Sequence, residues 1–307
     1  MAPELSTVGV IGLGNMGAPV ASHVRKAGMT VQAFDVRREV ADEVARRHDL
    51  IAVHEIDVLA GADAIITVLP TGIQVAEAFD ALSSSLRPGM VWIDMSSSDP
   101  VHTVALAARA AERGIRLVDA PLSGGVHAAW AGRLTVMVGG EDDAVQCTMP
   151  LLRAVGSSVY RTGRLGSGHA MKALNNAVAA AGLVAAGEAL AVATRFGVDP
   201  RVFVEVINAS TGRNVATERK LPDHVLPGRF DSGFALALMV KDVAIACELA
   251  DHLDARSSVM HRVLDVCDEA RSALEPRADH TQVVSWLLSG GARQNTGSAP
   301  LTSLVKP

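Results

Sequence analysis

The sequence has little of what marks secreted, metal-binding or nucleic-acid-binding proteins. Its three cysteines, Cys147, Cys247 and Cys267, are an odd and widely spaced set without a CxxC pair. This predicts reduced thiols in the cytoplasm, packed as small apolar groups. The ten histidines show no His-x-x-x-His spacing, so no metal site is predicted. A net charge of -5 offers no basic surface for nucleic acid or for an anionic membrane.

Targeting signals and internal repeats are also missing. The N-terminal residues MAPELS have no basic or apolar region of the kind found in signal peptides, which fits a cytoplasmic protein. The apolar run from Ala177 to Ala193 is short for a membrane span, contains Glu188 and consists mostly of Ala and Gly. It predicts a central helix buried on nearly all sides, inside its domain or against a second subunit. We therefore expect a homodimer or homotetramer.

Short apolar segments alternate with helical ones in the first half of the chain, and only helical spacing follows. The expected strands are Thr7–Ile11, Val31–Phe34, Ala64–Leu69, Val91–Asp94, Arg116–Val118 and Leu134–Gly139. The expected helices between them are Ala18–Ala27, Ile73–Leu82 and Pro100–Arg113. Beyond Ala193 the expected helices are Pro200–Asn208, Asn214–His224, Phe234–Leu253, Ser257–Leu274 and Asp279–Leu288.

A glycine turn joins the first strand to the first helix in the pattern GxGxxG. The turn consists of Gly12, Leu13, Gly14, Asn15, Met16 and Gly17. In this context the glycines let a pyrophosphate approach, and the helix N-terminus stabilises it. Asp35 ends the next strand 18 residues after Gly17, near the spacing of the carboxylate that accepts ribose hydroxyls. Arg37 and Arg38 leave a 2′-phosphate, and hence NADP, as an alternative to NAD.

These patterns predict an α/β fold in which a Rossmann-type, parallel, doubly wound sheet is followed by an all-α domain. With 307 residues and 49% apolar content, the chain is long enough for two domains that each bury a core. The predicted domains are residues 1–163, which bind a dinucleotide, and residues 164–290, which are helical and serve substrate binding and oligomerisation. Residues 291–307 lack periodicity and are expected to form a flexible tail.

Two further segments have residue types suited to chemistry on a small acid. Ser123, Gly124 and Gly125 offer a hydroxyl and freely oriented backbone N–H groups, a suitable nest for a carboxylate, although an ordinary loop has the same composition. Lys172 and Asn176 are four residues apart and share one face of a helix. Gly168, one turn earlier, permits close approach of a ligand or of backbone. Burial at the start of an apolar helix favours the neutral form of a lysine, which can act as a base; the alternative is a surface lysine.

Four separated segments together resemble the β-hydroxyacid dehydrogenases, the family that includes 3-hydroxyisobutyrate dehydrogenase, over nearly the whole chain. They are residues 12–19 (GLGNMGAP), 119–125 (DAPLSGG), 166–176 (GSGHAMKALNN) and 241–243 (KDV). The resemblance implies Lys172 as catalytic residue, substrate held by Ser123, Gly124, Gly125 and Asn176, and a cofactor near Leu69, Pro70, Ser97 and Lys241. The residues around Asp35 are similar to those of the NAD-using members. The segment Val126–Trp130 departs from the family pattern.

The activity that the resemblance implies is NAD(P)-dependent interconversion of a small 3-hydroxy acid, similar to 3-hydroxyisobutyrate, and its semialdehyde or oxo acid. Lys172 would act as general acid and base. One alternative is a reductase of a small aldehyde acid such as succinic semialdehyde, glyoxylate, tartronate semialdehyde or sulfolactaldehyde. Others are an imine reductase, which Lys172 beside the carboxylate loop argues against, and a sensor that binds NAD(P) without turnover.

Overall fold

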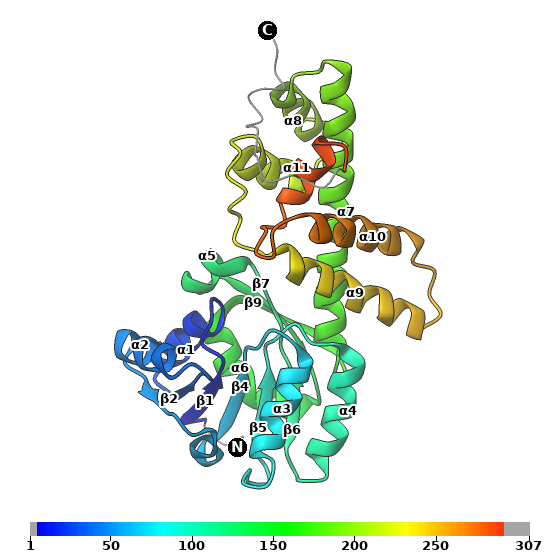
Figure 1. Ribbon diagram of the computed structural model, residues 1–307. Helices are drawn as coiled ribbons and strands as arrows, with labels where there is room; N and C mark the ends of the chain where they lie inside the picture. Colours follow the sequence, from blue (N-terminus) through cyan, green and yellow to red (C-terminus); the bar gives the residue numbers. More distant parts are fainter. Residues whose placement is uncertain (1–4, 292–307) are drawn as a thin grey trace. The chain divides into compact units, whose positions relative to one another are not determined.

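The computed structural model describes residues 5–291 and divides into two compact units, Met1–Lys172 and Ala173–Pro307. Figure 1 shows the helices and strands of each unit. The domain bounds 1–163 and 164–290 remain predictions, and the expected tail 291–307 lies, apart from Gly291, outside the described residues.

The first unit contains one nine-stranded sheet. Its strands are β1 (Thr7–Ile11), β2 (Thr30–Phe34), β3 (Ile51–Ala52), β4 (Ala64–Thr67), β5 (Val91–Asp94), β6 (Arg116–Asp119), β7 (Leu122–Ser123), β8 (Leu134–Gly139) and β9 (Gly156–Gly163). They lie in the order β3-β2-β1-β4-β5-β6-β8-β7, with β9 paired to β8. The first six strands are parallel, as predicted, but β8 runs antiparallel to β6 and β7, so the sheet is mixed.

Helices cover both faces of this sheet because neighbouring strand residues point to opposite sides. The helices are α1 (Gly17–Lys26), α2 (Arg38–His48), the 3-10 helix η1 (Ile56–Gly61), α3 (Gly72–Leu82), α4 (Pro100–Ala111), α5 (Gly125–Trp130) and α6 (Asp142–Val155). Ile66 and Ile93 pack in one cluster with α1 and α6. Ile65 and Trp92 pack in another with α3 and α4. This two-residue alternation produces a doubly wound arrangement.

Among its described residues, the second unit consists of helices joined by loops, with one isolated bridge between Ala235 and Asp279. It contains most of α7 (Ser167–Phe196), followed by α8 (Pro200–Asn208), the π-helix η2 (Ala216–Val225), α9 (Leu236–His252), α10 (Ser258–Ala273) and α11 (Gln282–Leu288). The ordinary α-helix expected over 214–224 is wrong in type. Pro222 has no N–H to donate to the preceding turn, which removes one α-helical hydrogen bond from this segment.

The long helix α7 is buried on one side within its own unit, and burial of its other side against a second subunit remains a prediction. Leu183 and Leu190 belong to the core of the second unit, whereas Val178 and Phe196 are 72% and 88% exposed. Among the described residues it is the one helix long and apolar enough to cross a membrane, and 44% of its most apolar window is buried. Core helices of soluble proteins pass the same test, so the helix has one core face and one apolar exposed face.

Candidate active site

The glycine turn after β1 is shaped by contacts that exclude any side chain at two of its three glycines. Gly12 has a φ of +91°, and a Cβ there would collide with the carbonyl oxygen of Val68. A Cβ on Gly17 would collide with the carbonyl oxygen of Gly12. In contrast, no atom lies within 4 Å of the position that a Cβ on Gly14 would take. The turn is therefore closed by Gly12 and Gly17 and open at Gly14.

This turn fits a dinucleotide pyrophosphate. Helix α1 begins at Gly17 without a side-chain N-cap and without an acidic residue in its first turn. The first N–H groups of α1 are therefore not capped by a side chain of the helix itself, and such groups favour binding of an anion. The open side of Gly14 is where a ligand can approach the backbone closely.

Asp35 lies at the carboxyl end of β2 and is 7% exposed. Its Oδ2 accepts a hydrogen bond from Leu13 N at 2.9 Å, and its Oδ1 accepts one from Arg37 N at 3.0 Å. The Arg37 side chain also reaches Oδ1, with Nε at 3.4 Å. Asp35 therefore supports the glycine turn directly through its hydrogen bond with Leu13 N. The spacing of Asp35 from Gly17 does not predict this contact.

The loops after β4 and β5, which carry Leu69, Pro70 and Ser97, are tied together by the residue before Ser97. Ser96 Oγ accepts a hydrogen bond from Leu69 N at 2.9 Å. Ser96 N in turn donates to Asp94 Oδ1 at 2.9 Å. Ser97 is the predicted residue of this loop, whereas Ser96 and Asp94, which hold the loop in place, are not among the predicted residues.

The expected carboxylate nest follows β7. Ser123 pairs with Thr135 of β8 and is half-buried, whereas Gly124 and Gly125 are exposed. Both glycines have positive φ, +134° and +74°, conformations that other residues rarely adopt. The backbone turns of this segment therefore depend on glycine, and its N–H groups begin the short helix α5.

Trp130, at the end of α5, packs toward α2. Its ring centroid is 5.1 Å from that of His48, and its carbonyl oxygen is 3.2 Å from His23 Nε2. Burial lowers the pKa of His48, and the charges of Arg47 and Lys26 lower it further. The departure from the family pattern at this position thus includes an aromatic contact between α5 and α2.

Lys172 lies on α7 and is half-buried. The start of α7 is held by Asp119 at the end of β6, whose two carboxylate oxygens accept hydrogen bonds from Gly166 N and His169 N, both at 2.8 Å. A Cβ on Gly168 would collide with the carbonyl oxygen of Met137. Of the two reasons considered for this glycine, close approach of backbone is the one observed.

Asn176 follows Lys172 by one turn of α7 and belongs to the second unit. Its Nδ2 donates to Asp242 Oδ2 at 2.5 Å, and its Oδ1 accepts from Asn175 Nδ2 at 3.0 Å. Lys241 Nζ lies 3.1 Å from Asp242 Oδ1. Asp242 is 2% exposed, so the pair of Lys241 and Asp242 is not a solvated surface pair. Asp242, which orients Asn176, is not among the predicted site residues.

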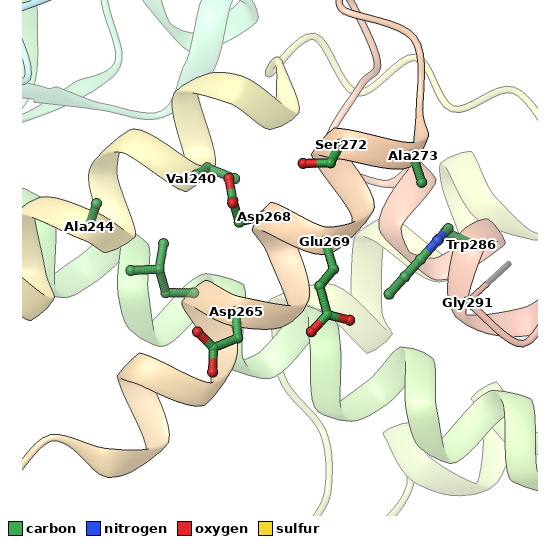
Figure 2. A pocket seen from close by; sticks show the side chains of 10 residues that line it. Val240, Ala244, Asp265, Asp268, Glu269, Ser272, Ala273, Trp286 and Gly291 are labelled. Carbon is green, nitrogen blue, oxygen red and sulfur yellow. The ribbon is translucent and has the colours of Figure 1, made fainter. Parts of the chain in front are cut away.

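Two hollows in the described part of the chain are lined by residues other than the predicted site residues. One, of about 750 Å³, lies among α9, α10 and α11 in the second unit. Figure 2 shows acidic side chains of α10 beside it, with Val240, Ala244 and Trp286 around them. Those acids are Asp265, Asp268 and Glu269, and they pair with Arg262 or Arg271. The other, of about 340 Å³, lies between α3 and α4. Among the described residues, no cluster of His, Cys, Asp and Glu could hold a metal ion.

The parallel strands bring most of the predicted site to one edge of the sheet. Gly12, Asp35, Leu69 and Ser97 follow β1, β2, β4 and β5, whose carboxyl ends meet at that edge. Asp119 at the end of β6 attaches the start of α7, which carries Lys172. Asn176 and Lys241 belong to the second unit, where Asp242 contacts both.

Comparison with known proteins covers both units. Residues 7–163 match the family model described as the NAD binding domain of 6-phosphogluconate dehydrogenase. Residues 166–287 match the model described as NAD-binding of NADP-dependent 3-hydroxyisobutyrate dehydrogenase.

Relatives with curated functions are similar over most of their length. The 2-(hydroxymethyl)glutarate dehydrogenase of Eubacterium barkeri is 36% identical, with 78% of this chain and 81% of that protein covered. Human mitochondrial 3-hydroxyisobutyrate dehydrogenase is 36% identical, with 79% and 75% covered. The NAD-dependent L-serine dehydrogenase of Pseudomonas aeruginosa is 33% identical, with 80% and 86% covered.

Solved structures agree with this. The 3-hydroxyisobutyrate dehydrogenase of Mycobacterium tuberculosis, solved with L-serine, has a TM-score of 0.85 and 30% identity, with 92% of this chain and 99% of that one covered. An imine reductase from a Pseudomonas species has a TM-score of 0.58 and 18% identity, with 92% and 99% covered, which is a likeness of fold alone.

Proposed function

The chain belongs to the β-hydroxyacid dehydrogenase family and is an NAD(P)-dependent oxidoreductase of hydroxy acids, and from that premise we propose its substrate class and the role of Lys172. The substrate is a small 3-hydroxy acid, similar to 3-hydroxyisobutyrate, and the product is its semialdehyde or oxo acid. The observation that carries the proposal is the half-buried Lys172 on a helix that Asp119 attaches to the carboxyl edge of the sheet.

The residues of the site have different roles, which follow from their charge and hydrogen-bonding groups. The hydroxyl of Ser123 and the backbone N–H groups of Gly124 and Gly125 bind the substrate carboxylate. Lys172 accepts the proton of the substrate hydroxyl during oxidation, and in reduction its ammonium returns that proton to the developing alkoxide. Asn176, whose amide nitrogen is fixed by Asp242, orients the substrate without adding charge. When bound, the nicotinamide accepts or returns the hydride.

For the cofactor we propose NAD rather than NADP. Asp35 is almost fully buried at the end of β2, and its carboxylate lies beside the glycine turn, where it repels a 2′-phosphate. Arg37 supports this assignment, because its Nε is paired with Asp35 and so is drawn toward the carboxylate.

The decisive experiment compares three lysine variants in the full-length protein. Lys172→Ala removes the proton acceptor, and turnover should fall by roughly two to four powers of ten. Lys172→Arg retains the cation but stays protonated, so it should be nearly as slow. Lys26→Ala, at an exposed end of α1, is the matched control and should keep the wild-type rate.

The measurement is NAD(P)-linked turnover across three- and four-carbon hydroxy acids and semialdehydes, with cofactor affinity measured separately by calorimetry. Oxidation by the wild type should rise with pH as the base loses its proton, and this limb should be flat in Lys172→Ala. Turnover by Lys172→Ala within threefold of wild type would exclude Lys172 as the base. Binding of NAD without turnover of any panel member would instead favour a sensor.

We also propose a homo-oligomer, at least a dimer, in which α7 lies at the interface. The large exposed apolar side chains of α7 are Met171, Leu174, Val178, Val192 and Phe196, and exposed apolar groups gathered on one helix favour a contact with another protein surface. Light scattering at micromolar concentration should therefore report a dimer or tetramer, and Val178→Glu should weaken it. Monomer alone in the wild type would contradict the proposal.

A further inference from the structure

A histidine that the mechanism does not use is buried in the first turn of α7, three residues before Lys172. His169 is 1% exposed. Its Nδ1 lies 2.8 Å from Thr103 Oγ1, and its Nε2 lies 3.6 Å from Asp94 Oδ2. Asp119 Oδ2 is 4.0 Å from Nδ1. Burying an imidazole between two carboxylates is costly unless its polar atoms are used, so a core-filling role does not account for it.

The surrounding groups determine where the proton of this ring lies. The Thr103 hydroxyl has one proton and two possible acceptors, Asp99 O at 2.9 Å and His169 Nδ1. A neutral ring protonated on Nδ1 would direct the lone pair of Nε2 at the Asp94 carboxylate 3.6 Å away, an unfavourable contact between two acceptors. The other neutral tautomer and the doubly protonated ring both have a hydrogen on Nε2. The geometry therefore assigns a proton to Nε2, facing Asp94.

His169 joins two sets of hydrogen bonds at the carboxyl edge of the sheet. Asp94 accepts from Thr67 Oγ1 at 3.0 Å, Ser98 Oγ at 2.7 Å and Ser96 N at 2.9 Å, and so organises the loops after β4 and β5. Asp119 accepts from two backbone N–H groups at the start of α7, one of them that of His169 itself. The 3.6 Å approach of Nε2 to Asp94 lies within ion-pair reach but is too long for a hydrogen bond.

We propose that His169 is a positioning residue for Lys172. Its backbone is held by Asp119, and its ring is held by Thr103 of α4 and attracted by Asp94. The first turn of α7 is thereby kept in one place relative to the loops that carry Leu69 and Ser97. Because displacing a reacting group by about 1 Å can cost about a hundredfold in rate, a group that keeps this turn in place affects the rate through Lys172. This inference rests on the proposed function of Lys172.

The test uses two substitutions of His169 in the full-length enzyme. His169→Leu fills the space but has no ring nitrogen to contact Thr103 or to face Asp94, and it should lower kcat roughly ten- to hundredfold while KM and cofactor Kd stay within about threefold. His169→Gln has an oxygen that can accept from Thr103 and an amide N–H that can face Asp94, so it should recover most of kcat. Loss without recovery by Gln, or a Leu variant that retains the wild-type kcat, overturns the proposal.

A second pair of variants serves if His169→Leu does not fold. Thr103→Val removes the partner of the ring, whereas Thr148→Val removes an equally buried hydroxyl that bonds only to its own helix, at Val145 O. A lower kcat in Thr103→Val than in Thr148→Val supports the proposal, and equal values overturn it. The proton on Nε2 is checked directly by nitrogen-15 NMR of the wild-type imidazole, and an unprotonated Nε2 also overturns it. The proposed function fails separately, through an active Lys172→Ala.

Discussion

The two units use buried polar groups in different ways. In the first unit, Asp35 and Asp119 lie at strand ends and accept hydrogen bonds from the backbone of neighbouring loops and of α7. In the second unit, Asp279 accepts hydrogen bonds from Ser232 Oγ, Gly233 N and Phe234 N, which belong to one loop next to a buried histidine. The first arrangement shapes a ligand-binding edge from backbone, whereas the second closes a loop of the helical core.

The two units therefore differ in which change destabilises them. The backbone of the first unit passes so closely at Gly12, Gly17 and Gly168 that a single added methyl group would meet a carbonyl oxygen. The second unit instead contains His280, whose pKa burial lowers to about 4, with the charge of Lys220 adding to the effect and Asp279 opposing it. We therefore expect the first unit to respond most to added volume and the second unit to respond most to acid.

The largest effect is expected at the glycine turn. Gly17→Ala places a methyl group against the carbonyl oxygen of Gly12 and should abolish folding of the turn or lower the melting temperature steeply. Gly14→Ala meets no atom within 4 Å, so the cofactor-free protein should melt as the wild type does while cofactor affinity falls. Calorimetric melting and NAD titration separate the two results. Equal melting of both variants would remove the distinction drawn between these glycines.

In the second unit, acid is expected to lower the free energy of unfolding by about 3 kcal/mol. The folded pKa of His280 is about 4 and the reference value is 6.5, so between these values the unfolded chain binds a proton that the folded chain does not. Stability should therefore fall as pH decreases from 6.5 toward 4. Hydrogen exchange resolved by peptide should show amides of the second unit opening first.

The matched variant for this measurement is His280→Gln, which removes the titrating group and should flatten the loss of protection between pH 6.5 and 4. Opening of the first unit at a higher pH than the second would reverse the comparison.

The smallest effect concerns the cofactor edge of the first unit. Asp35→Ser removes the charge that repels a 2′-phosphate, and the ratio of kcat/KM for NAD over NADP should fall at least tenfold, equivalent to about 1.4 kcal/mol. Because Asp35 also accepts from Leu13 N, Asp35→Asn is the control that keeps an acceptor without the charge. A wild type that already prefers NADP would show that Asp35 does not exclude a 2′-phosphate, and it would favour Arg37 as the phosphate contact.

Local patterns in the sequence were sufficient for most elements of the first unit. Strands β1, β5 and β8 have the predicted bounds, because their apolar runs are short and end at glycine or polar residues. Helix α2 is not among the predicted elements: Val40, Ala41, Val44 and Ala45 repeat at helical spacing, but charged residues fill most of its other positions. Helix α6, which contains Pro150 within the helix, is not among them either.

The sequence by itself determined the glycine turn, the family and the candidate residues, because those signals are contiguous and need no partner elsewhere in the chain. Only the tertiary structure decided that Asp119 holds Gly166 and His169, about 50 residues away, and that Asp242 holds Asn176, 66 residues away. These contacts arise because the carboxyl ends of parallel strands meet at one edge of a sheet and helices pack side by side. Neither the spacing of residues nor their polarity predicts which buried carboxylate contacts which amide.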